Sequence, residues 1–186
     1  DLVYAGYRGS MLNEDAKLVP VSLYAETKLM GEVKIKETFD NYIILRTALL
    51  YGFGLNNSRC HFHYSYDALK KGESIKLFND QYRTPLSLIE ASGIIAQLVK
   101  LDIKEDTINF GGAERISRLG LIEELCNATA LDKSLLQPVS MNDVKGHSHV
   151  ADVSMDTSKL KSFGIELKSI RESIDESLKY YLEGNL

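Results

Sequence analysis

The sequence is poor in cysteine and proline, and it contains neither tryptophan nor a long apolar run. Its two cysteines, Cys60 and Cys126, form no C-x-x-C pair, which argues against a disulfide scaffold and a zinc ribbon. A reducing cytoplasm is therefore the expected location. The longest apolar runs, at 43–45 and 48–51, fall far short of the ~20 residues that span a membrane. No signal peptide is expected, because a charged segment followed by a long apolar one is missing.

Clusters of basic residues are missing too. The chain has 22 Lys and Arg against 26 Asp and Glu, a net charge of −4, and its basic residues are scattered. Binding to nucleic acid or to an acidic membrane surface depends on clustered positive charge, so neither partner is expected. The chain is long and apolar enough to form a substantial core, since 44% of its 186 residues are apolar.

The pattern of the chain predicts one α/β unit over 1–186. No internal repeat, low-complexity tract or linker divides it, and strand patterns alternate with helix patterns. Strands are expected at 2–4, 42–51, 74–78, 86–88, 108–110 and 135–139, and helices at 23–38, 61–71, 90–101, 118–128 and 170–182. The almost continuous apolar run at 42–51 is typical of a central parallel strand covered on both faces.

Two helix starts carry clear capping signals. Ser22 precedes the helix expected at 23–38, and Ser169 with Glu172 three residues later forms a capping box for the helix at 170–182. The first of these helices is expected to present a repeating apolar face formed by Leu23, Met30 and Val33.

Tyr24 and Lys28 are the pair most suggestive of chemistry. They lie one helical turn apart, so the Lys28 ammonium can approach the phenol and favour its phenolate form. Such a tyrosine can act as general acid or base in the interconversion of a carbonyl and an alcohol. Taken alone, this spacing is common and usually marks a solvated helix face.

The segments around this pair carry a family resemblance. They are DLVYAG at 1–6, the acidic NED at 13–15 with Pro20, YAETKLMGE at 24–32, LRTALLYG at 45–52, NDQYRTP at 79–85 and DTSKL at 156–160. In this order they resemble the extended short-chain dehydrogenase/reductase proteins that act on nucleotide sugars. The similarity is greatest to the dTDP-4-dehydrorhamnose reductase-like branch and extends over nearly the whole chain.

The resemblance implies an architecture. The chain would be the C-terminal part of an NAD(P)-binding Rossmann-type fold together with a small α/β substrate-binding region. Residues of about 1–55 would form the remaining part of the sheet with the Tyr24 helix. Residues of about 56–186 would form mostly the substrate-binding region, with one strand and helix returning to the sheet near 84–101.

The resemblance also implies roles for individual residues. Tyr24 would protonate the alkoxide that forms when hydride from NADPH or NADH reaches the C4 ketone of a nucleotide-linked sugar. Lys28 would assist Tyr24 and hydrogen-bond the nicotinamide ribose, while Ala48 and Leu49 would lie against the nicotinamide. Arg83 would contact the nucleotide diphosphate, which a guanidinium suits, or it is an ordinary surface arginine.

The chain departs from the family pattern in ways that shape these expectations. The phosphate-cradling Gly-x-x-Gly-x-x-Gly turn and the catalytic Ser/Thr are absent. We therefore expect the C-terminal part of a longer protein, inactive alone, which pairs with a missing N-terminal half or self-associates, for example as a homodimer. Leu49 replaces a tryptophan and Ala5 an aspartate of the family pattern, so the sugar stays open, as does the choice between NADH and NADPH.

Two alternative functions remain at this point. The same branch includes the regulatory subunit of methionine adenosyltransferase, a non-catalytic partner of another enzyme, and the wider superfamily includes nucleotide-sugar epimerases and dehydratases. No metal site is expected: His147 and His149 are interpreted as loop residues because no third ligand is near. Cys60 is interpreted as a packed thiol.

Overall fold

The computed structural model describes residues 1–7, 9–54, 58–144 and 150–184. The helices are α1 (Leu23–Thr38), α2 (His61–Lys70), α3 (Leu88–Leu98), α4 (Arg118–Thr129), α5 (Ser158–Ser162) and α6 (Ile170–Leu182), with short 3-10 turns at Lys133–Leu135 and Met141–Asp143. The strands are β1 (Ile43–Thr47), β2 (Leu50–Tyr51), β3 (Ile75–Phe78), β4 (Tyr82–Arg83), β5 (Leu86–Ser87), β6 (Asp106–Phe110), β7 (Ile116–Ser117) and β8 (Leu136–Val139). His147 and His149 lie outside the described residues.

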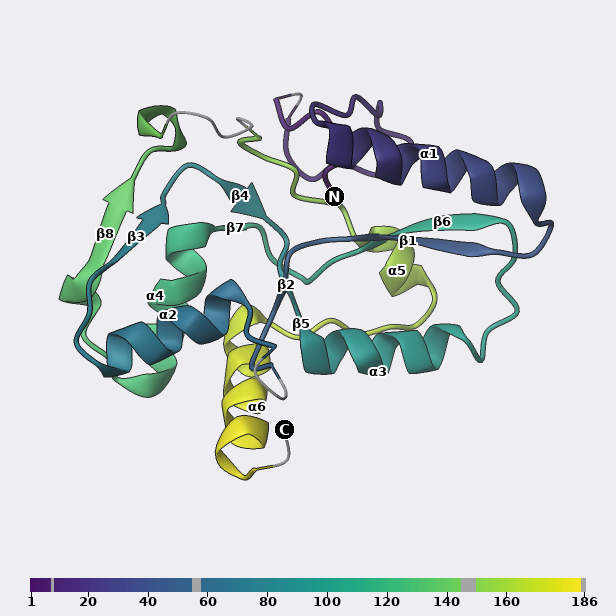
Figure 1. Ribbon diagram of the computed structural model, residues 1–186. Coiled ribbons are helices and arrows are strands. Elements are labelled where there is room, and N and C mark those ends of the chain that lie inside the picture. Colours follow the sequence, from purple (N-terminus) through teal and green to yellow (C-terminus); the bar gives the residue numbers. More distant parts are fainter. Residues whose placement is uncertain (8, 55–57, 145–149, 185–186) are drawn as a thin grey trace.

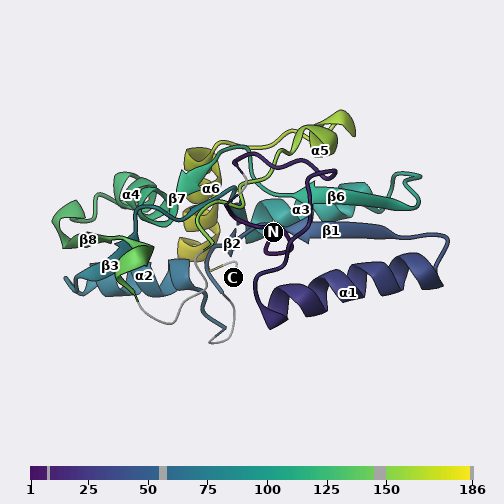
Figure 2. The same ribbon diagram turned by 90° about the horizontal axis from the view of Figure 1, so that it is seen from above.

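One region of the fold is a parallel strand pair between two helices. Strands β1 and β6 pair in register from Ile43 opposite Asp106 to Thr47 opposite Phe110, with α1 on one face and α3 on the other (Figures 1 and 2). A core under the α3 face joins α3, β6 and α5, and its fully buried members include Ile108 and Leu160. Parallel strands covered by helices are the arrangement expected for an α/β sheet.

The second region lies beside the first and contains α2, α4, α6, β3 and β8 (Figures 1 and 2). Strands β3 and β8 pair in parallel, and a larger core holds the helices together around residues such as Phe62, Leu125 and Ile174. The short pairs β2–β5 and β4–β7 connect the two regions. Functional side chains carried by these connecting strands therefore lie at the boundary between the regions.

The strand expected at 42–51 is wrong as a single element, because the chain changes partners at residues 48 and 49. The amide of Ala48 still donates to the carbonyl of Phe110 at 2.9 Å, whereas the carbonyl of Leu49 accepts from the amide of Leu86 at 3.0 Å. β1 therefore pairs with β6, and β2 pairs with β5. Burial on both faces is also incomplete, since only Ile44 and Arg46 of β1 are buried.

The predicted strand at 2–4 is wrong as well. The amide of Tyr4 donates to the carbonyl of Asp1 at 3.0 Å, so the backbone turns there, and Tyr4 forms only an isolated bridge with Leu18. Turn geometry at 1–4 prevents a regular ladder.

Both predicted helix starts are confirmed. The hydroxyl of Ser22 accepts from the amide of Ala25 at 3.2 Å, and Ser169 and Glu172 form the reciprocal capping box. The residues expected to form the apolar face of α1 are exposed in the described chain: Leu23, Met30 and Val33. The side of α1 that meets the sheet carries Ala25, which is buried. No helix among the described residues has both the length and the apolar character needed to cross a membrane.

Candidate active site

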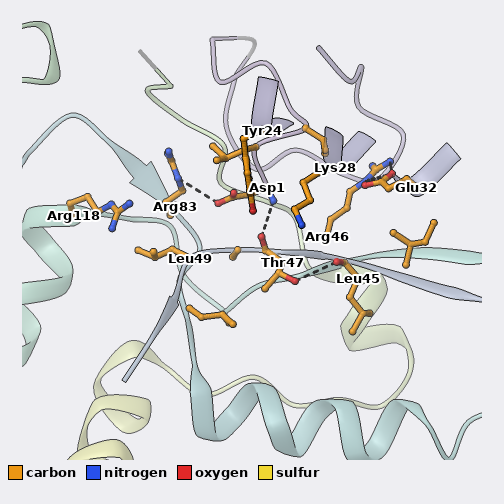
Figure 3. A pocket seen from close by; sticks show the side chains of 15 residues that line it. Asp1, Tyr24, Lys28, Glu32, Leu45, Arg46, Thr47, Leu49, Arg83 and Arg118 are labelled. Carbon is orange, nitrogen blue, oxygen red and sulfur yellow. Dashed lines mark hydrogen bonds and ion pairs between the residues drawn. The ribbon is translucent and has the colours of Figure 1, made fainter. Parts of the chain in front are cut away.

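A cavity of about 510 Å³ opens where α1 faces the junction of β1 and β2. It lies at the boundary between the two regions of the fold, and its lining comes from residues 1–3, α1, β1, β2, β4 and the start of α4 (Figure 3). The side chains that bear on its chemistry are Asp1, Tyr24, Lys28, Glu32, Arg46, Ala48, Leu49, Arg83 and Arg118. All five residues that the sequence nominates as site residues line this one cavity.

Tyr24 and Lys28 stand on the wall formed by α1. The Lys28 ammonium lies 5.5 Å from the centroid of the Tyr24 ring, and Tyr24 is 59% exposed. Both side chains extend toward the cavity (Figure 3). Helical spacing of four residues produces this arrangement, which places the ammonium beside the phenol ring.

Ala48 and Leu49 form the floor at the partner change between β1 and β2. Ala48 is buried and Leu49 partly buried, and both line the cavity. They continue the uninterrupted row of residues 44–50 that lines the cavity along β1 and into β2. A flat apolar ring can pack against a floor of this kind.

Arg83 is a buried cation and not a surface side chain, since only 5% of it is exposed. Its guanidinium donates to the carbonyls of Tyr82 at 2.6 Å and Val150 at 3.3 Å, and its Nε lies 3.5 Å from a carboxylate oxygen of Asp1. Burial, reinforced by the positive charge of Arg118, lowers the pKa of Arg83 to about 10. The charged guanidinium is therefore incompletely compensated where it meets the cavity.

Arg118 is a site residue that the sequence reasoning missed. Strands β4 and β7 pair Tyr82 with Ser117 and Arg83 with Ile116, and the Arg118 amide donates to the Gln81 carbonyl at 3.1 Å. In this antiparallel ladder Arg118 lies diagonally from Arg83 on the same face.

The Arg118 side chain has no carboxylate partner within the described chain. Its Nε donates to the neutral Gln81 Oε1 at 3.0 Å, and burial lowers its pKa. The sequence offered only a weak signal, an arginine directly after the capping Ser117 in a helix whose first turn has no acidic residue.

The charge of the cavity is positive on balance. Its lining contains four cationic side chains, Lys28, Arg46, Arg83 and Arg118, and two anionic ones, Asp1 and Glu32. Glu32 is bound by Arg46, and Asp1 lies beside Arg83. The Arg83 and Arg118 end lies on the far side of Tyr24 from the Arg46–Glu32 pair (Figure 3). Two buried guanidiniums at one end of a cavity favour a phosphate-bearing or carboxylate-bearing ligand.

The remaining candidate groups lie apart from this chemistry. The thiol of Cys60 donates to the carbonyl of Gly52 at 3.2 Å, and burial raises the pKa of Cys126. Across the residues that the structure describes, no three histidine, cysteine or acidic side chains gather closely enough to hold a metal ion.

Comparison with known proteins adds a family match and curated relatives. A family model described as the RmlD substrate binding domain matches residues 1–183. The beta subunit of methionine adenosyltransferase 2 from Mus musculus is 26% identical over 188 residues, which is 98% of this chain and 56% of the relative. A probable low-salt glycan biosynthesis reductase from Haloferax volcanii is 23% identical over 146 residues, 77% of this chain and 48% of the relative. The chain thus spans about half the length of these curated relatives.

Solved structures share the fold. A dTDP-4-dehydrorhamnose reductase from Bacillus anthracis in complex with NADP has a TM-score of 0.85 at 20% identity, over 98% of this chain and 63% of that one. Its counterpart from Clostridium acetobutylicum has a TM-score of 0.86 at 21% identity, over 97% and 63%. A dTDP-glucose 4,6-dehydratase from Bacillus anthracis in complex with NAD reaches 0.77 at 16%, over 96% and 58%. These likenesses confirm the expected α/β class with Rossmann-type neighbours.

Proposed function

Because the chain belongs to the RmlD substrate-binding domain family, we propose that it forms the Tyr-Lys and substrate-binding part of an NAD(P)H-dependent reductase. Its substrate would be a nucleotide-linked 4-keto-6-deoxy sugar. The observation that carries this proposal is the single cavity that joins Tyr24 and Lys28 at one wall to Arg83 and Arg118 at its end. The solved relatives with NADP and NAD support a nicotinamide cofactor of either kind.

The residues at the α1 wall fit the nicotinamide end of such a cofactor. The small side chain of Ala48 leaves the floor open beside Tyr24, and the Lys28 ammonium can donate hydrogen bonds to ribose hydroxyls. When bound, the reduced nicotinamide supplies a hydride to the ketone carbon. Tyr24 donates its phenolic proton to the ketone oxygen as negative charge develops there, so that the products are an alcohol and a tyrosinate. Lys28 stabilises the tyrosinate until a proton from solvent restores the phenol.

The arginine end of the cavity would hold the nucleotide diphosphate. Arg83 and Arg118 share one face of the β4–β7 ladder, and burial disfavours the charge of both, as their lowered pKa values indicate. A bound diphosphate would supply the negative charge that these guanidiniums lack, through hydrogen bonds strengthened by charge on both partners. Arg118 would thus share the diphosphate contact that the family resemblance implies for Arg83.

We further propose that the open edge of β1 pairs with a strand from outside this chain. Among the described residues β1 pairs only with β6, and its other edge borders the cavity. Unpaired edges of parallel strands favour association. The partner would be an N-terminal part of the same protein or a second copy of the chain. Light scattering after size exclusion would contradict this if the chain were a well-folded monomer.

A second candidate function is that of a regulatory subunit without turnover. It is favoured by the 26% identity to the beta subunit of methionine adenosyltransferase 2. On this alternative Tyr24 and Lys28 would be retained without a role in hydride transfer.

Turnover by the protein at its natural length distinguishes the two candidates. The assay follows the loss of reduced-nicotinamide absorbance with dTDP-4-keto sugars. Tyr24→Phe is expected to lower kcat by about 10² to 10⁴ without weakening cofactor binding, because only the proton is removed. Tyr64→Phe is the matched control, since Tyr64 is equally exposed on α2 but does not line the cavity. Unchanged turnover by Tyr24→Phe would refute the catalytic role, and absence of turnover by the unaltered protein would favour the regulatory one.

A further inference from the structure

Apolar packing anchors α1 weakly to the rest of the molecule. Ala25 is the buried residue of this helix, and Leu29 packs against the neighbouring core from a partly buried position. The large side chains of Leu23 and Met30 are exposed. Helices usually gain most of their stability and orientation from an apolar face, so α1 needs another contact to fix its position on the sheet.

That contact is the ion pair between Glu32 and Arg46. The Glu32 carboxylate accepts from Nε of Arg46 at 3.1 Å and from Nη2 at 2.9 Å, and the two side chains are 11% and 4% exposed. Nη1 of Arg46 donates to the Tyr4 hydroxyl at 3.0 Å and to the Glu14 carbonyl at 2.9 Å. Burial opposes the charge of Arg46, but the hydrogen bonds to Glu32 and Tyr4 outweigh it and raise the pKa.

The same carboxylate lies within reach of Lys28. Glu32 follows Lys28 by four residues, which places the two side chains on neighbouring positions of one helix face. Within the described chain Lys28 nevertheless forms no ion pair, while Glu32 is occupied by Arg46. The Lys28 ammonium lies instead over the Tyr24 ring.

We propose that Arg46 is a positioning residue that keeps the Lys28 ammonium available to Tyr24 by binding the Glu32 carboxylate. Without the guanidinium, Glu32 would be a largely buried carboxylate with no partner, which is costly, so it turns to the ammonium one helical turn away. Lys28 is then neutralised and drawn from the phenol. The inference rests on the proposed function only in taking Tyr24 as the proton donor.

Other charged groups around the cavity do not replace this arrangement. Arg83 and Arg118 lie toward the opposite end, and the remaining carboxylate of the lining, Asp1, faces Arg83. Figure 3 shows Lys28 between Tyr24 on one side and the Arg46–Glu32 pair on the other. Glu32 also interacts with the amino group of Asp1, which donates to the carbonyl of Thr47 at 2.8 Å, so Arg46 and this amino group are the basic groups that face Glu32.

The test follows the Lys28 side chain by NMR in the chain labelled with nitrogen-15 at the lysine ammonium, with Lys28→Gln to assign the resonance. Arg46→Gln is expected to shift the Lys28 ammonium resonance, because the ammonium leaves the Tyr24 ring and pairs with the freed Glu32 carboxylate. The double variant Arg46→Gln with Glu32→Gln is expected to return it. Glu37→Gln is the matched control, since this carboxylate of α1 pairs with Lys34 at the surface.

Two results would overturn the proposal. One is an unchanged Lys28 ammonium resonance in folded Arg46→Gln, and the other is a double variant as shifted as the single one, which would indicate a merely structural role. A second measurement needs no change at Arg46: Glu32→Gln is expected to leave the Lys28 ammonium nitrogen resonance in place, and a large shift would show that Glu32 already pairs with Lys28. These readouts need neither cofactor nor substrate, so they can succeed even if the reductase proposal fails.

Discussion

Asn109 is expected to be the costliest polar residue to remove from the sheet region. It is fully buried on β6, where its side-chain amide donates to the carbonyls of Leu12 at 2.8 Å and Asp156 at 3.1 Å. Its Oδ1 accepts from the Tyr4 hydroxyl at 2.7 Å. Tyr4 in turn accepts from Arg46, so Asn109 supports the network that holds α1.

The magnitude follows from these three contacts. Asn109→Ala removes three hydrogen bonds, each worth about 0.5 to 1.5 kcal/mol. Two of the groups left behind keep a partner, because the Leu12 carbonyl still accepts from the amide of Asp156 at 2.9 Å and the Tyr4 hydroxyl can donate to the carbonyl of Asn13 at 3.2 Å. We expect a loss of about 2 to 4 kcal/mol in the free energy of unfolding, a large share of the about 5 to 15 kcal/mol typical of a domain.

Urea denaturation followed by circular dichroism measures this loss. Asn127→Ala is the matched control, because Asn127 makes a single exposed hydrogen bond to Glu124 at 3.2 Å and should change stability by less than about 0.5 kcal/mol. A loss below about 1 kcal/mol for Asn109→Ala would refute the reasoning that this residue ties the connection before α1 to the sheet.

Three further outcomes are expected. Arg118→Gln should weaken the binding of inorganic diphosphate or a nucleoside diphosphate about 10-fold, as measured by calorimetry. Arg171→Gln, at the surface, should leave this affinity unchanged. If the two variants bound diphosphate equally well, Arg118 would not belong to the site. Leu125→Ala should cost about 2 to 5 kcal/mol of unfolding free energy, and Leu23→Ala, at a 76% exposed position, almost nothing. Burial lowers the pKa of His63, so the unfolded chain binds more protons below about pH 6.5 and stability should fall as the pH drops through that region. In His63→Leu this dependence should weaken but not vanish, because burial lowers the pKa of His61 as well; an unchanged dependence would place the titration elsewhere.

Local chemistry made part of this structure predictable from sequence. The hydroxyl of Ser22 and the pair Ser169 and Glu172 act within one turn, so their capping roles follow from spacing alone. The placement of Tyr24 and Lys28 on one helix face follows in the same way. The alternation of strand and helix patterns predicted the α/β class, and the resemblance to the extended short-chain dehydrogenase/reductase proteins added the Rossmann type; the solved relatives confirm both.

Features that depend on distant partners were not predictable. The break after β1 arises because Ala48 and Leu49 bond to different strands, Phe110 on one side and Leu86 on the other. Arg118 reaches the cavity through the pairing of β4 with β7, and no local sequence pattern predicts this pairing. The exposure of the apolar residues on α1 was not predictable for a related reason, because periodicity identifies apolar positions but not what covers them.

Transfer of a labelled hydride tests the central claim most directly. The protein at its natural length would be incubated with a dTDP-4-keto-6-deoxy sugar and reduced nicotinamide carrying deuterium at the transferable position, and the product examined by mass spectrometry and NMR. The account predicts one deuterium on the carbon that was the ketone, and strongly reduced incorporation with Tyr24→Phe but not with Tyr64→Phe. Product without deuterium, or incorporation unaffected by Tyr24→Phe, would contradict it.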